Sequence, residues 1–349
     1  MIKTKLMVFG GSGFLGKEIL LSFFTGVMPP EEQVVSVSRS ETRIIDAMLQ
    51  LEEAYPHKNL LFKSADVTNA AQVRELIFIY RPEKVIIASA MKHIHLCESN
   101  VDQAVNVNVM GTRNIINAVD ELNASLPENK RTKLVFVSTD KACEPIGTYG
   151  YTKSLAEKVV LKSGYNVVRY GNVLNSPMSI IPRLRSLPEG STINLTHTDM
   201  TRFLMTAEQA VRLISAAMYC LPPGYIYVPE LFAMKISDLM ELYAEKKNLK
   251  INVTNSWVNE KLHEKMVGEL ENAYRTLETI GKVSKVSNLN SGVFRLGPPG
   301  HEEKNYPRKN FISSHHLITK EHLKDMLVEL NLKKKKKKWQ NKKRLTSLL

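Results

Sequence analysis

The sequence lacks any apolar run long enough to cross a membrane. No stretch of its 349 residues approaches the roughly 18 consecutive apolar residues that a spanning helix needs. The N-terminal stretch MIKTKLMVFGG reaches glycines before the apolar core of a signal peptide could form. We therefore expect a cytoplasmic protein without a membrane span.

Cysteine is also scarce. The three cysteines, Cys97, Cys143 and Cys220, show neither metal-ligand spacing nor a paired pattern. Their scarcity argues against a disulfide framework and fits a reducing compartment. We expect them to be small buried apolar residues, and we expect no metal site.

Acidic residues are missing from residues 331–349, NLKKKKKKWQNKKRLTSLL, which hold eight Lys and one Arg. The net charge of the chain is +13, so removing these nine positive charges leaves +4 for the rest. A run of like charges is typical of a solvated, disordered tail, and nucleic acid or an anionic surface is the alternative partner of such a run. Nucleic-acid binding is therefore expected, if at all, only through this tail.

The sequence does contain a regular alternation of apolar runs and segments with helical periodicity. Strands that are apolar on both faces and separated by helices form a parallel sheet, wound by right-handed crossovers and covered on both sides. The sequence thus predicts an α/β fold with a doubly wound parallel sheet. The predicted strands are 5–9, 33–38, 60–63, 84–89, 133–138 and 165–170, and the predicted helices are 13–24, 40–53, 70–80, 101–122 and 149–163.

The first predicted strand runs into GGSGFLGKEIL, a GxxGxxG spacing that opens a helix. Glycines there let the backbone turn tightly and approach a pyrophosphate, whose charge is met by free N–H groups at the helix N-terminus. A glycine triplet alone is a weak signal, but strand, triplet and helix in this order predict a dinucleotide-binding Rossmann fold. The cofactor-binding residues expected in this loop are Gly10, Ser12, Gly13, Phe14, Leu15 and Gly16.

The end of the second strand selects the cofactor. An acid there would bind the ribose 2′-hydroxyl of NAD, whereas this chain has Ser38, Arg39 and Ser40, whose hydroxyl groups and cation suit the 2′-phosphate of NADP. We expect NADP rather than NAD. The alternative is that Arg39 is a solvated surface charge.

Two further segments are expected at the cofactor. Asp66, with Val67 beside it, follows the third strand and is either an acceptor for the adenine amino group or a helix N-cap. Ala88, Ser89 and Ala90 follow the fourth strand, and their small side chains would let that backbone pass close to the cofactor.

Tyr149 and Lys153 lie four residues apart and share one face of a predicted helix. A phenol titrates near pH 10 in water, and a neighbouring ammonium favours its phenolate, a base able to take a proton from a sugar hydroxyl. YxxxK is common by chance. Here it follows a strand that ends in Ser138 and Thr139 and lies well downstream of GxxGxxG, so it predicts a dehydrogenase-type site.

With these residues the chain resembles the extended short-chain dehydrogenase/reductases, and within them the UDP-N-acetylglucosamine 4,6-dehydratases of the polysaccharide-biosynthesis type. The resemblance runs from about residue 5 to 267. Its most specific element is the pair Asp140 and Lys141, where sugar 4-epimerases and dTDP-glucose dehydratases carry other pairs. The matching stretches are GGSGFLG, AMKHIHLCE, NVNVMGTRN, STDKACEPIGTYGYTK, VVRYGNVLNS, DMTRFLMTAEQAV and EKLHE.

The resemblance implies a redox-neutral elimination of water. After oxidation at C4, Lys141 removes the C5 proton, Asp140 protonates the departing C6 hydroxyl, and the hydride returns to C6. A lysine with a reference pKa near 10.4 serves as this base only if its site lowers that pKa. Tyr149 in the YxxxK position implies the inverting, C5-epimerising type. The alternative is that Asp140 and Lys141 form a surface ion pair.

Other roles carry over from the family residue by residue. Thr139 would hold the sugar, Lys92 would line the same cleft, Asn108 would steady the catalytic lysine, and Asn172 would face the substrate. Arg202 is a candidate for the nucleotide diphosphate, because a guanidinium pairs bidentately with phosphate, and a structural salt bridge is its alternative. Lys92, Asn108, Tyr149 and Lys153 are expected to face the cofactor as well.

The chain departs from the family pattern in two substrate-binding stretches. Trp257 in SWVNEKLHE stands where the family carries the arginine of RPGEKLHE, so one expected phosphate contact is missing. NSPMSIIP at 175–182 replaces a stretch that normally resembles GSRGSVIP. These departures make the sugar nucleotide less firmly implied than the reaction type.

The expected organisation is an NADP-binding Rossmann domain in residues 1–174, with a returning segment near 200–222. Residues 175–330, rich in Pro and Gly, are expected to form mainly a substrate-binding lobe with helices at 207–220 and 235–247. The basic tail 331–349 follows.

The leading hypothesis is an NADP-dependent 4,6-dehydratase of a UDP-sugar, UDP-N-acetylglucosamine, that acts in the synthesis of a surface glycan. The resemblance also implies a homo-oligomer, a dimer or a hexamer. A sugar-nucleotide 4-epimerase or 4-ketoreductase is the alternative enzyme. A non-catalytic NADP-binding scaffold with a basic docking tail is the alternative of another class.

Overall fold

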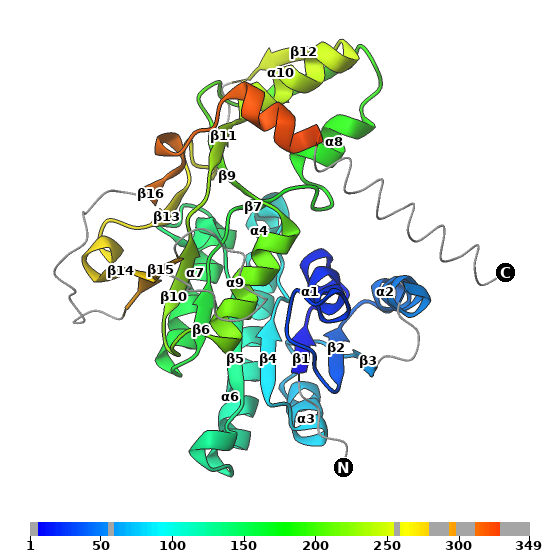
Figure 1. Cartoon of the computed structure of the whole chain (residues 1–349), viewed down its shortest axis with the longest axis vertical. Coiled ribbons are helices and arrows are strands. Elements are labelled where there is room, and N and C mark those ends of the chain that lie inside the picture. The colour runs from blue at the N-terminus through cyan, green and yellow to red at the C-terminus, as the bar shows by residue number, and fades with distance from the viewer. Residues whose placement is uncertain (1–5, 55–58, 255–258, 279–292, 298–310, 329–349) are drawn as a thin grey trace.

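The computed structural model describes residues 6–54, 59–254, 259–278, 293–297 and 311–328 (Figure 1). Trp257 and the basic tail 331–349, both considered above, lie outside the described residues. The helices are α1 (Phe14–Thr25), α2 (Glu41–Ala54), α3 (Ala70–Tyr80), α4 (Ile94–Ser99), α5 (Val101–Val105), α6 (Gly111–Ala124), α7 (Thr148–Lys162), α8 (Ile180–Ser186), α9 (Ala207–Tyr219) and α10 (Ile236–Lys247). The strands are β1 (Leu6–Phe9), β2 (Val34–Ser38), β3 (Leu60–Ser64), β4 (Lys84–Ile87), β5 (Lys133–Val137), β6 (Asn166–Val168), β7 (Asn172–Val173), β8 (Thr192–Leu195), β9 (Thr201–Met205), β10 (Ile226–Pro229), β11 (Ala233–Lys235), β12 (Lys250–Val253), β13 (Lys265–Val267), β14 (Arg275–Glu278), β15 (Val293–Leu296) and β16 (Phe311–Ile312).

Within the described ranges, nine strands form one sheet in the order β14-β15-β10-β6-β5-β4-β1-β2-β3. The seven strands from β10 to β3 pair in parallel, and β15 and β14 add an antiparallel edge. The strand order reverses at β1, which lies between β2 and β4. A crevice for a nucleotide opens at the carboxyl ends of the strands at such a point. The doubly wound α/β Rossmann fold predicted from the sequence is confirmed.

Helices cover both faces of this sheet. Helices α1 and α9 bury Leu20 and Ile214 against one face. Helices α3, α6 and α7 bury Ile77, Val119 and Val160 against the other. All four residues of β1 are buried, as expected of a strand that is covered on both sides.

A third apolar core lies in the C-terminal half of the chain. Helices α8 and α10 and the helix at 320–328 contribute Leu184, Leu239 and Leu323 to it. In Figure 1 these elements lie together at the top of the molecule, beyond the large sheet. The segment that carries β7 and β9 connects the two regions.

Three features of the fold were not predicted. Residues 94–99 form the short helix α4, and the antiparallel pair β14–β15 extends the sheet. The predicted helix 101–122 is interrupted by a π-helical turn at Asn106–Met110, which separates α5 from α6. A π-turn widens the helix locally and is common at functional sites. Here it carries the buried Asn108.

Candidate active site

The glycine loop joins β1 to α1 in a crowded space. Gly10 has a φ of +85°, and a Cβ there would lie 2.6 Å from the backbone nitrogen of Ser89, so only glycine fits. A Cβ on Gly16 would lie 2.2 Å from the carbonyl oxygen of Gly10. The N-cap of α1, Gly13, offers no side-chain hydrogen bond, and the first turn carries no acid. The first N–H groups of the helix are therefore left for an anion, as a dinucleotide pyrophosphate requires.

The end of β2 lies against this loop. The Ser38 side chain is buried, and its hydroxyl accepts a hydrogen bond of 3.0 Å from the N–H of Ser12. Arg39 and Ser40 are exposed. The Arg39 guanidinium, 62% exposed, forms a 3.2 Å ion pair with Asp66, so this surface cation is anchored beside the loop rather than fully solvated. Phe14 and Leu15 begin α1 next to it.

Asp66 is not a helix N-cap, which corrects one of its two predicted roles. Its Oδ1 accepts hydrogen bonds from the N–H and the hydroxyl of Thr68, each 2.9 Å long. The N-cap of α3 is instead Asn69, whose side chain accepts from the N–H of Gln72. Partial burial opposes ionisation, but the Thr68 bonds and Arg39 together lower the pKa of Asp66 below its ordinary value.

The neighbouring Val67 is buried against α6. A Cβ on Gly111 would lie 2.6 Å from a methyl carbon of Val67. The carbonyl oxygen of Val67 accepts a 3.0 Å hydrogen bond from the Asn114 side chain. These contacts hold the loop that carries Asp66 against α6.

The segment after β4, with Ala88, Ser89 and Ala90, passes next to Gly10 of the glycine loop, and its approach to the cofactor stays a prediction. Asn108 holds the continuation of this segment. Its side chain exchanges two hydrogen bonds with the backbone of Met91, at 2.8 and 3.0 Å, and donates a third to Thr152 Oγ1 at 3.0 Å. The Asn108 side chain therefore bridges the segment after β4 to α7, and its role of steadying the catalytic lysine stays a prediction.

Lys92 lies farther along this segment and is exposed. Loss of hydration and the charge of Arg43 lower the pKa of Lys92. Arg43 and Lys92 also lower the pKa of His93, after its own loss of hydration. Three cations, Arg39, Arg43 and Lys92, thus lie on the side of the structure where the cofactor is predicted, and Arg43 was not predicted from the sequence.

The strand β5 delivers the central residues of the site. Thr139 caps a short 3₁₀ turn at Asp140–Ala142. The Thr139 hydroxyl donates a 2.8 Å hydrogen bond to Asp140 Oδ1 and accepts one from the N–H of Lys141 at 3.4 Å. Asp140 is only 1% exposed, so it is not part of a surface ion pair.

Helix α7 brings Tyr149 to this turn. A Cβ on Gly150 would lie 2.5 Å from the carbonyl oxygen of Lys141. Glycine at this position therefore allows α7 to pack closely against the turn. Glu98 fixes the start of the helix, since its carboxylate accepts hydrogen bonds from the N–H and the hydroxyl of Thr148, at 2.6 and 2.9 Å. Sequence reasoning did not identify this contact from α4.

Tyr149 and Lys153 do not interact as predicted. Burial and then Asp140 raise the pKa of Tyr149, although its hydrogen bond with Thr139 opposes them. The Lys153 ammonium donates a 2.7 Å hydrogen bond to the carbonyl of Val137 and lies 3.8 Å from the centre of the Phe136 ring. Burial lowers the pKa of Lys153 to about 7. The predicted lowering of the tyrosine pKa by this lysine is therefore absent from the structure.

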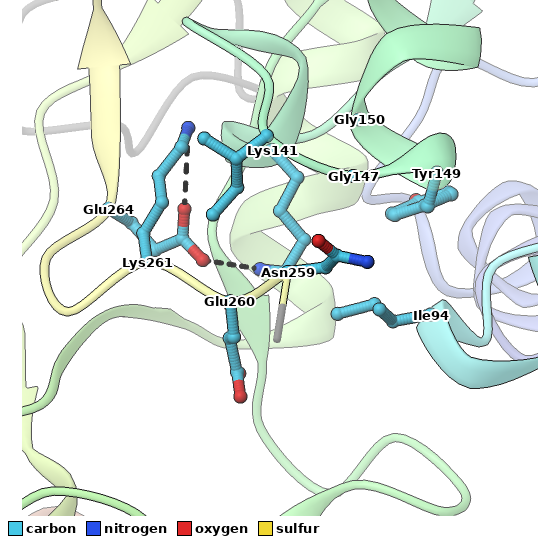
Figure 2. Close-up of a pocket in the computed structure, with 10 residues that line it drawn as sticks. Ile94, Lys141, Gly147, Tyr149, Gly150, Asn259, Glu260, Lys261 and Glu264 are labelled. Atoms are coloured by element: carbon cyan, nitrogen blue, oxygen red, sulfur yellow. Dashed lines mark ion pairs between the residues drawn. The ribbon is translucent and has the colours of Figure 1, made fainter. Parts of the chain in front are cut away.

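Lys141 lies between two carboxylates. Its Nζ is 3.2 Å from Asp140 Oδ1 and 2.9 Å from Glu264 Oε1, and Figure 2 shows Glu264 between Lys141 and Lys261. Burial lowers the pKa of Lys141, but Asp140 and Glu264 outweigh it and raise the pKa well above the ordinary value. In this arrangement the site therefore does not provide the lowered pKa that a lysine base requires.

The pKa of Asp140 is also raised. Burial and the charge of Glu264 raise its pKa, against the effect of Lys141. Its second oxygen, Oδ2, is buried and accepts no hydrogen bond from any described residue. A buried carboxyl group of this kind favours its protonated form and can act as an acid.

Arg202 belongs to the same cluster. Its guanidinium is 3% exposed, pairs with Glu260 at 2.6 Å and lies 3.7 Å from Glu264. It also donates hydrogen bonds to the backbone carbonyl groups of Thr201 and Lys261. The structure thus corrects the diphosphate role of Arg202, because these partners occupy its donors and make it the structural salt bridge that was the alternative.

A pocket connects several of these residues (Figure 2). Its enclosed volume is about 20 Å³, which is room for a single water-sized group. Asn172 is half-buried in β7, where it pairs with Leu204 of β9, and the pocket lining does not include it. The residues that line the pocket are Ile94, Lys141, Ile146, Gly147, Tyr149, Gly150, Asn259, Glu260, Lys261 and Glu264.

The structure therefore brings together Thr139, Asp140, Lys141 and Tyr149, with Lys153 one helical turn away. It adds Glu264, which the sequence contained within EKLHE but which received no predicted role. The cluster offers a lysine and a phenol that line one pocket, with a buried acid paired to the lysine, a set suited to moving protons on a bound substrate.

Neither a membrane-spanning helix nor a metal site is found in the described part of the chain. Its helices are too short or too polar to cross a bilayer. No three His, Cys, Asp or Glu side chains in these residues are grouped as metal ligands.

Known proteins resemble the chain in sequence and in structure. Residues 6–285 match the polysaccharide biosynthesis protein family. UDP-N-acetylglucosamine 4,6-dehydratase (inverting) of Campylobacter jejuni is 28% identical, over 86% of this chain and 90% of that protein. UDP-glucose 4-epimerase of Rickettsia rickettsii is 32% identical, over 78% and 80%. The X-ray structure of Pen from Bacillus thuringiensis superposes with a TM-score of 0.80 at 26% identity, over 94% of this chain and 99% of that one.

Proposed function

Because the chain belongs to the polysaccharide biosynthesis protein family of nucleotide-sugar dehydratases and epimerases, we propose that it is an NADP-dependent 4,6-dehydratase of a UDP-sugar. The proposed substrate is UDP-N-acetylglucosamine, and the product is a UDP-4-keto-6-deoxyhexosamine, epimerised at C5, for a surface polysaccharide or glycan. The observation that carries the proposal is the ion pair of the buried Asp140 with Lys141, next to Tyr149. A dehydratase needs an acid and a base in addition to the tyrosine, and this pair supplies both.

Four residues of the cluster, Thr139, Asp140, Lys141 and Tyr149, have a role in the proposed reaction. Tyr149 takes the proton of the C4 hydroxyl, and Thr139 holds the sugar at the end of β5. Lys141 removes the C5 proton in its neutral form, and Asp140 gives its proton to the C6 oxygen, which leaves as water. Burial of Asp140 supports the acid role because it raises the pKa of that carboxyl group.

A nicotinamide cofactor, when bound, would supply the hydride chemistry that links C4 and C6. The glycine loop with Ser12, the first turn of α1, and the segment Ala88–Ala90 would hold the dinucleotide. NADP is favoured over NAD by the absence of an acid at the end of β2 and by the exposed cation Arg39. A 2′-phosphate would compete with Asp66 for the Arg39 guanidinium.

We also propose that the elements around the third core form the main part of the substrate-binding lobe within residues 175–330, and that Asn172 faces the substrate. Exposed apolar side chains on neighbouring helices support a homo-oligomer. They include Val101 (49% exposed) on α5, and Tyr151 (57%) and Leu155 (51%) on α7. A Leu155→Asp variant should dissociate to a smaller species in light scattering.

The decisive experiment is a product-mass measurement with UDP-N-acetylglucosamine and NADP. The expected product has lost one water, with no net formation of NADPH. The variant Lys141→Ala should lose this activity while it still binds the cofactor. An unchanged substrate mass with the wild-type protein would refute the proposal, and full turnover by Lys141→Ala would refute the assignment of the base.

A 4-epimerase is the second candidate, supported by the identity of 32% to a UDP-glucose 4-epimerase. The same measurement separates the two, because epimerisation leaves the mass unchanged and gives an isomer with different chromatographic mobility. A 4-ketoreductase would consume NADPH in proportion to product. Any turnover at all would exclude a non-catalytic scaffold.

A further inference from the structure

Glu264 is a carboxylate in the candidate site that has no role in the proposed reaction. It is 1% exposed, and its backbone is fixed by two 2.9 Å hydrogen bonds with Ser313. Its carboxylate meets three cations: Lys141 at 2.9 Å, Arg202 at 3.7 Å and Lys261 at 4.0 Å. Figure 2 shows it facing the pocket between the two lysines. Its Oε2 accepts no hydrogen bond from a described residue.

The proposed elimination requires a specific proton arrangement. Lys141 must be neutral to take the C5 proton, and Asp140 must be protonated to release water. The ion pair seen in the structure differs from that state by the position of one proton. Moving it over the 3.2 Å between Lys141 Nζ and Asp140 Oδ1 breaks one N–H bond and forms one O–H bond, with no change in net charge. A single transfer therefore creates the base and the acid together.

We propose that Glu264 is a positioning residue that determines where this shared proton lies. Its carboxylate holds the proton on Lys141 before the reaction and stabilises the Lys141 ammonium that forms again when the C5 proton has been taken. Arg202 and Lys261 limit this effect, because they share the same carboxylate. The inference rests on the proposed function and adds to it a third charged group, distant in sequence from the Asp140–Lys141 pair.

The charged groups around Asp140 and Lys141 determine how the rate of water loss should depend on pH if Glu264 has this role. The 3₁₀ turn and α7 contribute Asp140 and Tyr149, β9 contributes Arg202, and the segment before β13 contributes Glu260, Lys261 and Glu264. The charge of Glu264 raises the pKa of both Lys141 and Asp140. Removing it lowers both, and the remaining cations Arg202 and Lys261 act in the same direction.

The test is the pH dependence of water loss in Glu264→Gln. Both the acid and the alkaline limbs of the kcat profile should shift to lower pH, by about one unit or more, as expected when an opposite charge within 4–6 Å is lost. The matched control is Glu269→Gln, an exposed carboxylate on the other side of β13, which should leave both limbs in place. A purely structural role of Glu264 would lower kcat without moving the limbs, and that result would overturn the inference.

A second measurement does not depend on turnover. In protein labelled with ¹³C at lysine Cε, the resonance assigned through Lys141→Met should titrate at lower pH in Glu264→Gln than in the wild type, and an unchanged titration would overturn the inference. If Glu264→Gln does not fold, Glu264→Asp should shift the limbs in the same direction by less, because the carboxylate retracts from Lys141. A wild-type protein that does not dehydrate the sugar would refute the proposed function alone, since the titration still reports on Lys141.

Discussion

Lys153 makes the stability of the protein depend on pH in a calculable way. The side chain is 2% exposed, and burial lowers its pKa to about 7, although Glu157 opposes the shift. In the unfolded chain a lysine titrates near pH 10.4. Between these values the unfolded chain binds one proton more than the folded protein, so the free energy of unfolding rises with pH. A shift of more than three pKa units corresponds to about 4 to 5 kcal/mol.

Replacing Lys153 by Met removes this titration. At pH 7 and below, the folded wild type carries a buried ammonium, so the stability of Lys153→Met relative to the wild type should be highest there. The difference should fall by about 4 kcal/mol between pH 7 and pH 10, at close to 1.4 kcal/mol per unit. The carbonyl of Val137 loses a donor in the variant, at a cost of about 1 to 3 kcal/mol. That cost is the same at every pH and does not affect the slope.

Urea denaturation of both proteins at pH 7, 8, 9 and 10 measures the slope. Lys158→Met is the matched control, because Lys158 lies on the same helix and is exposed. Its difference from the wild type should not change with pH. A difference for Lys153→Met that stays constant from pH 7 to 10 would refute the reasoning that burial has lowered the pKa of Lys153.

Three other variants test the arrangement of the site. Arg169→Met leaves Glu157 and Glu271 without the buried guanidinium that pairs with both at 2.6 and 2.7 Å. The free energy of unfolding should fall by about 3 to 5 kcal/mol, and an unchanged denaturation midpoint would contradict this. Gly150→Ala places a Cβ 2.5 Å from the carbonyl oxygen of Lys141, so turnover should fall roughly 10- to 100-fold while cofactor affinity in calorimetry stays the same. Arg39→Ala should weaken NADP binding roughly 10- to 100-fold, the value of a hydrogen bond to a charged group, and leave NAD binding unchanged. Equal losses for both cofactors would contradict the assigned 2′-phosphate contact.

Local patterns in the sequence predicted the parallel sheet and the position of the catalytic helix. The apolar runs correspond to β1 through β6 because a strand buried on both faces needs consecutive apolar residues. The four-residue spacing of Tyr149 and Lys153 placed them on one helix, α7. The alternation of strands and helices in the sequence was therefore sufficient to predict the Rossmann fold.

Contacts between residues distant in sequence were not predictable in the same way. Lys153 is directed to the carbonyl of Val137 instead of to Tyr149, because the ring of Phe136 and that carbonyl form its nearest surroundings. Asp66 and Asn69 compete for the start of α3, and only the backbone geometry shows that Asn69 is the cap. The closely spaced charges of EKLHE are the sequence signal that could have indicated a role for Glu264. Its contact with Lys141 nevertheless depends on how a segment more than a hundred residues later folds back.

The Arg169 network has a consequence for the newly synthesised chain. The guanidinium follows β6, and its partner Glu271 lies 102 residues later. At a synthesis rate of 5–20 residues per second, the ribosome needs about 5 to 20 s to add that segment. During this interval Arg169 and Glu157 can pair with each other, but Cys143 and the turn that carries Asp140 lack the C-terminal segment that covers them. The nascent N-terminal half should therefore be a client for chaperones until residue 271 has left the ribosomal exit tunnel.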